Sequence, residues 1–111
     1  MLNKRLEQLS DLVEQAHAKI QQQFVHINPV VGINLGMRDV GIPADVMTID
    51  CLKTGKRIII VLHDQQPEII QYQFSYKDQD PALEFETLAS KNLSSEYLFD
   101  WMKSYFHQPV S

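Results

Sequence analysis

The fold is decided by residues 45–76, which read DVMTIDCL, KTGK, RIIIVLHD, QQP and EIIQYQFSY. Three runs rich in β-branched and aromatic residues, 45–52, 57–64 and 68–76, are separated by short segments that hold Gly or Pro. Such runs with compact turn signals between them are typical of antiparallel strands joined by hairpins. The stretch therefore predicts a three-stranded antiparallel meander.

The alternation of apolar residues predicts how these strands pair. A two-residue loop at Thr54-Gly55 and a three-residue loop at 65–67 would place one apolar face on all three strands. The expected pairs are Cys51 with Ile58, Ile49 with Ile60, Met47 with Leu62, Leu62 with Ile70, Ile60 with Tyr72 and Ile58 with Phe74. A slip of one residue would bring Arg57 and Asp50 into that face, so the pattern disfavours it.

The reverse face of this sheet is only half apolar. It carries Val46, Thr48, Asp50, Leu52, Arg57, Ile59, Val61, His63, Ile69, Gln71, Gln73 and Ser75. The middle strand would be buried on both sides only if this second face is also covered. The cover could be the C-terminal helix, the 27–44 segment or another protein.

Two helices flank the strands. Apolar residues spaced by three and four from Leu2 to Phe24 predict an amphipathic helix over residues 3–25, packed on the sheet or, alternatively, paired with another helix as in a coiled coil. The stretch Leu93-Ser94-Ser95-Glu96 supplies an N-cap serine for a C-terminal helix that presents an aromatic stripe to the sheet.

Two further segments allow additional strands. Val30 to Leu35 could form a short edge strand or an ordered apolar loop, and Leu83 to Thr87 alternates as a short strand would. We therefore expect one α+β domain over residues 1–111, with an N-terminal helix, a meander of three, four or five strands, and a C-terminal helix packed on the sheet.

Composition narrows the range of partners. The net charge is -4 and the ten Lys and Arg residues form no basic cluster, which disfavours nucleic acid. The longest aliphatic run, Ile58 to Leu62, is far shorter than the ~20 residues of a membrane span. Cys51 is the single cysteine, so no intramolecular disulfide can form, and the cytoplasm is the expected location.

Polar residues near the strand ends are the candidates for chemistry. His63-Asp64 ends the central strand and could perform acid-base work, or it could be a solvated surface pair. Asp50 lies inside a strand, where a carboxylate needs an ion-pair partner, water or a ligand. The candidate ligand or partner face consists of Thr48, Asp50, Arg57, His63, Asp64, Gln71 and Gln73. No spacing predicts a metal site or a cofactor.

Two functional hypotheses follow. The first, which the missing catalytic motif favours, is a small cytoplasmic interaction, adaptor or chaperone-like module. It would bind a second copy of itself, as a homodimer, or a protein partner, through the face of Val46, Ile59, Val61 and Ile69 or through the Leu2 to Phe24 seam. The second is a small enzyme or a small-molecule-binding domain with Asp50, His63 and Asp64 around a pocket. The order helix, sheet, helix is loosely similar to that of many small adaptor, secretion-chaperone and regulatory domains, but folds host unrelated functions.

Overall fold

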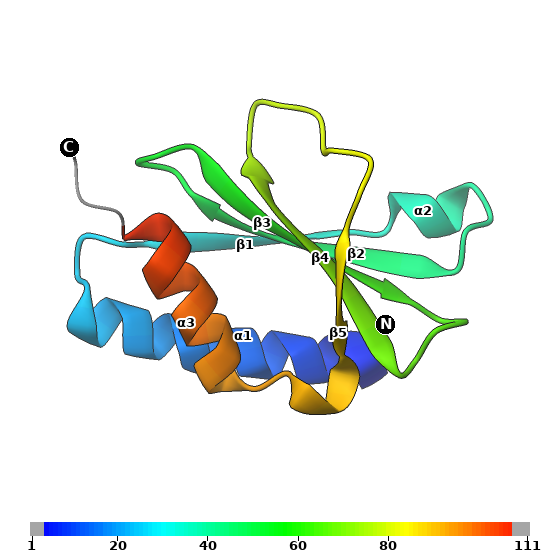
Figure 1. Ribbon diagram of the computed structural model, residues 1–111, viewed down its shortest axis with the longest axis horizontal. Helices are drawn as coiled ribbons and strands as arrows, with labels where there is room; N and C mark the ends of the chain where they lie inside the picture. The colour runs from blue at the N-terminus through cyan, green and yellow to red at the C-terminus, as the bar shows by residue number, and fades with distance from the viewer. Residues whose placement is uncertain (1–3, 108–111) are drawn as a thin grey trace.

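The structure is a computed structural model that describes residues 4–107 of the chain (Figure 1). In chain order its elements are α1 (Lys4–Gln23), β1 (Pro29–Asn34), α2 (Gly36–Asp39), β2 (Ala44–Cys51), β3 (Lys56–His63), β4 (Ile69–Tyr76), β5 (Glu86–Ala89), the 3-10 turn η1 (Ser90–Asn92) and α3 (Ser95–Phe106).

The strands form one antiparallel sheet whose spatial order, β1-β2-β3-β4-β5, is the order of the chain. The α+β class, the central meander and the two flanking helices are confirmed, and both optional segments do add a strand. The last strand begins at Glu86, later than the alternation from Leu83 suggested. The short helix α2 was not predicted.

The pairing of β3 with β4 is as predicted, but the pairing of β2 with β3 is not. Ile49 lies opposite Ile58 and Met47 opposite Ile60, a shift of two residues from the expected register. The loop is longer than assumed: the four residues 52–55 connect the strands, and Gly55 closes the turn with a φ of 75° and an N–H donated to the Cys51 carbonyl at 2.8 Å. A shift of two residues leaves every side chain on its face, so the apolar pattern could not detect it.

Both long helices cover the same face of the sheet, and they lie below it in Figure 1. The α1 stripe, consisting of Leu6, Leu9, Val13, Ala16 and Ile20, is buried in the core with Ile58 and Ile60 of β3 and with Leu98 and Met102 of α3. The helix thus packs on its own sheet, which was the first of the two expectations, and Leu2 lies outside the described residues. Ser94 caps α3 as predicted, since its side chain accepts the Tyr97 N–H at 3.1 Å.

The reverse face is partly covered by its own chain. A second, smaller cluster joins Ala44, Ile59 and Val61 to Met37 of α2 and to Phe85 of the 77–85 segment. Figure 1 shows α2 and this segment above the sheet, on the side opposite to the two long helices. Of the three covers expected, the 27–44 segment contributes and the C-terminal helix does not.

Candidate functional site

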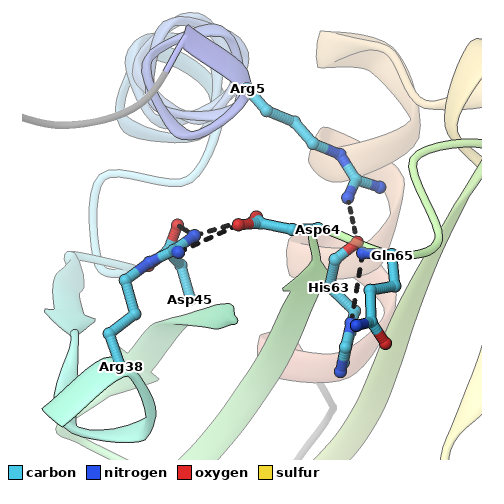
Figure 2. A network of polar contacts seen from close by, with 6 residues as sticks. All are labelled: Arg5, Arg38, Asp45, His63, Asp64 and Gln65. Atoms are coloured by element: carbon cyan, nitrogen blue, oxygen red, sulfur yellow. Dashed lines mark hydrogen bonds and ion pairs between the residues drawn. The ribbon is translucent and has the colours of Figure 1, made fainter. Parts of the chain in front are cut away.

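A buried carboxylate anchors a polar network at the start of β2 (Figure 2). The Asp45 side chain is only 1% exposed, and Arg38 of α2 binds both of its oxygens, through Nε at 2.6 Å and Nη2 at 2.9 Å. A bidentate arginine-carboxylate pair is among the stronger charge-assisted contacts in proteins. The network therefore fastens α2 to the start of β2.

The two residues of the predicted acid-base pair, His63 and Asp64, bind different partners. The Asp64 carboxylate accepts two further hydrogen bonds from Arg38, both at 2.9 Å, and these bonds are the main reason that its pKa lies below the usual range. His63 Nδ1 accepts the backbone N–H of Gln65 at 3.3 Å, and Figure 2 shows the His63 and Asp64 side chains pointing in different directions. A carboxylate with a low pKa in an ion pair is a weak proton acceptor.

Arg5 of α1 extends the same region toward β4. Its guanidinium donates to the His63 carbonyl at 3.0 Å, to the Ile69 carbonyl and to Ser90 Oγ at 3.1 Å. Burial lowers the pKa of this guanidinium. Arg5 therefore ties α1 to the two residues that flank the β3–β4 loop and to η1, which is a structural role.

Asp50 and Arg57 form an ion pair across β2 and β3. Because of the true register they lie directly opposite each other, with Nε to Oδ1 at 2.6 Å and Nη2 to Oδ2 at 2.9 Å. The hydrogen bonds to Asp50 raise the pKa of Arg57. Asp50 therefore has the ion-pair partner that a strand carboxylate needs, and Thr48, two residues away, lies opposite Gly32 of β1.

Gln73 of β4 holds the 77–85 segment in place. Its amide accepts the Ala82 N–H at 2.9 Å and donates to the carbonyls of Ala82 and Glu84 at 3.1 and 2.8 Å. Gln71 lies opposite Thr87 of β5. The Gln73 side chain thus keeps the segment close to β4 beyond Tyr72, where the pairing with β5 ends.

An open groove of about 570 Å³ lies between β4 and this segment. Its wall on the strand side is Tyr72 to Tyr76, and its other wall is formed by Gln79, Asp80, Ala82, Glu84 and Glu86. The lining includes three carboxylates and no basic side chain. Phe74 and Tyr76 are each 42% exposed, so the groove is bordered by aromatic surface.

Aromatic rings of β4 and α3 continue from the groove. Trp101 contacts Tyr72 and Phe74 with ring centroids at 4.5 and 5.7 Å, Phe74 stacks on Tyr105 at 4.9 Å, and Tyr97 meets Trp101 edge-on at 5.6 Å. Burial, then the nearby Glu86 and Tyr97, raise the pKa of Tyr72. An aromatic surface beside carboxylates results.

The seven predicted site residues do not converge on one pocket. The structure brings Asp50 to Arg57, Asp64 to Arg38 and Gln73 to the 77–85 segment, so these polar groups serve structural contacts. Sequence reasoning missed Arg5, Arg38 and Asp45, and it missed the groove. The one available signal for the groove was the acidic composition of 78–86 beside the aromatic alternation at 72, 74 and 76.

Three further findings concern metal binding, membrane spans and similarity to known proteins. Among residues 4–107, no three His, Cys, Asp or Glu side chains are grouped so that they could hold a metal ion. No helix within this range is long and apolar enough to cross a membrane. Comparisons of the chain with protein-family models, with curated proteins and with solved structures find no match in any of the three.

Proposed function

We propose that this protein is an interaction module that binds an extended, basic segment of a partner protein in the groove beside β4. The observation that carries the proposal is the coincidence, in one groove, of an edge position of β4, Phe74, that lies beyond the pairing with β5, of three carboxylates and of exposed aromatic rings. Each of these features recognises one property of such a segment.

The strand edge would recognise the extended backbone. The backbone N–H of Lys77 donates to the Gly55 carbonyl at 2.7 Å and so continues the β3–β4 ladder. The backbone hydrogen-bonding groups alternate in direction along an antiparallel strand. The N–H and C=O groups of Gln73 and Ser75 therefore point toward β3, while those of Phe74 and Tyr76 point away from it. The pairing of β4 with β5 ends at Tyr72 and Glu86. A peptide can therefore add to the edge at Phe74, as in β-strand addition.

The carboxylates would select the charge of the partner. Asp80, Glu84 and Glu86 line one groove with no cation among them. An array of one sign attracts an oppositely charged segment and repels acidic ones. Phe74 and Tyr76 would add contacts to apolar side chains and to the faces of cationic ones.

The openness of the groove favours a peptide over a small molecule, because ligand sites for small molecules bury most of the ligand's surface. The polar residues that an enzyme would need, His63 and Asp64 among them, contact other partners in the described structure. The free, buried thiol of Cys51 suits a reducing compartment, so the cytoplasm remains the proposed location.

The proposal is tested with two synthetic peptides of eight residues, one alternating Lys with Val and one alternating Glu with Val. Trp101 is the single tryptophan and touches Phe74, so its fluorescence reports on the groove. We expect the Lys peptide to change the emission and to bind more weakly as salt is added. The Glu peptide should produce no change.

A charge-reversed variant locates the site. In Asp80→Lys/Glu84→Lys/Glu86→Lys each lost ion pair is worth about 0.5 kcal/mol, so the Lys peptide should bind at least about tenfold more weakly. The matched control Asp11→Lys/Glu14→Lys/Asp39→Lys makes the same charge change at exposed positions of α1 and α2. Equal loss of binding in both variants would show only a general charge effect and would refute the groove.

A further inference from the structure

β1 is an edge strand with an unusual surface. Val30, Val31, Ile33 and Leu35, in and just after it, are 40–43% exposed. No Asp, Glu, Lys or Arg occurs from Val25 to Met37, and Pro29 stands only at the first position of the strand. Natural proteins usually protect an exposed edge with charges, bulges or a covering segment, because open edges pair with other strands.

The ladder determines which backbone groups of β1 are free to pair. The backbone N–H of Asp64 donates to the Pro43 carbonyl at 2.8 Å, which continues the register of β2 with β3. Because these groups alternate in direction, the backbone N–H and C=O of the odd-numbered residues of β2 point toward β3, and those of the even-numbered residues point toward β1. Val30, Gly32 and Asn34 are thus the β1 residues that bond to β2, and Val31 and Ile33 direct N–H and C=O outward.

We infer that β1 pairs antiparallel with β1 of a second copy of this chain, with Val31 opposite Ile33 of the partner subunit. This pairing is symmetric about Gly32, so each copy contributes the same surface, as a two-fold dimer requires. Val31 and Ile33 each meet a residue that also points outward, and both N–H···O bonds form at each pair.

Neighbouring registers are poorer. A two-fold axis at Val31 would place Pro29 opposite Ile33 of the partner subunit, and proline has no N–H to donate. An axis at Ile33 would require Leu35, which lies beyond the end of β1 and whose carbonyl already accepts the Arg38 N–H at 3.0 Å. The axis at Gly32 is therefore the one that uses every outward group.

The side chains suit the same register. Val31 and Ile33 lie on the face of the sheet that α1 covers, since they pair with Ile49 and Met47, whose side chains are in the core beneath it. An antiparallel pair keeps equivalent faces together, so these half-exposed apolar side chains would cover one another across the axis. Neither strand brings a charge to the contact.

The pairing is tested first by sedimentation of the full chain at concentrations up to millimolar. We expect a dimer for the wild type and, for Val31→Lys/Ile33→Lys, dimerisation roughly 100-fold weaker, because lysines then face lysines. Circular dichroism checks that this variant folds. A wild-type monomer throughout, or a double variant that dimerises as tightly, would overturn the inference. Neither substitution touches the groove beside β4, so the two proposals can fail separately.

The register is tested by mixing single variants. Val31→Lys mixed with Ile33→Glu puts opposite charges into one cross-strand pair, and this mixture should form the heterodimer preferentially. Val31→Lys mixed with Val31→Glu places no opposite charges face to face and should gain much less. The reverse preference would contradict a two-fold axis at Gly32 and favour one at Val31.

Discussion

Ile60→Ala will lower the free energy of unfolding by about 4 kcal/mol, within the usual range for deleting a fully buried isoleucine side chain down to alanine. Ile60 is 0% exposed at the centre of β3, where it lies in the cluster that joins the sheet to α1 and α3. Its neighbours in this cluster come from the sheet and from both long helices, so we expect the cavity to close only in part. Denaturation by urea measures the loss as a change in midpoint at constant slope.

Ile59→Ala is the matched control on the other face of the same strand. Ile59 is 5% exposed and belongs to the smaller cluster with Ala44, Val61, Met37 and Phe85, whose covering segments are short. These segments can settle into the space, so we expect a loss of about 2 kcal/mol. Equal losses at the two positions would contradict the view that one face holds the main core.

Asp45→Asn will lower the free energy of unfolding by about 3 kcal/mol. The new amide keeps the size of the carboxylate but removes its charge and turns one acceptor into a donor that faces Arg38. Arg38 keeps its hydrogen bonds to Asp64, but at the 1% exposed end of the network an amide N–H would face a guanidinium N–H, and buried polar groups without a complementary partner are costly. A loss below about 1 kcal/mol in urea denaturation would show that this network is not an anchor of α2.

Asp64→Asn is the corresponding change at the exposed end of the network, and we expect less than about 1 kcal/mol at neutral pH. The pKa of Asp64 is lowered by folding, so its contribution is present above the ordinary value of 3.8 and is lost as the pH falls through the lower folded value. The difference between wild type and variant should therefore vanish in strong acid. A difference in unfolding free energy between wild type and variant that grows as the pH falls would contradict the lowered pKa of Asp64.

Much of the fold could be predicted because it rests on periodicity. The stripe from Leu6 to Ile20 and the cap at Ser94 are local signals, and the structure places both as expected. The error in the β2–β3 register has a physical reason, since a shift of two residues preserves the faces. One cue would have removed it: only the true register sets Asp50 directly opposite Arg57.

The candidate site was less predictable because its polar residues are used in long-range contacts. Arg38 meets Asp64 across 26 positions of sequence and Arg5 meets His63 across 58, and no local pattern indicates such pairs. The groove depends on how the 77–85 segment passes over β4, which Gln73 determines by binding Ala82 and Glu84. The sequence identified Gln73 but not its role.

The most direct test of the groove is amide hydrogen exchange at Phe74, followed by nuclear magnetic resonance with and without the Lys-Val peptide. The Phe74 N–H points away from β3 into the groove, so a peptide that adds as a strand must slow its exchange, and we predict at least about a tenfold effect. The Val31 amide, which points outward at the opposite edge of the sheet, should not respond. Unchanged exchange at Phe74 under saturating peptide would contradict the proposed function.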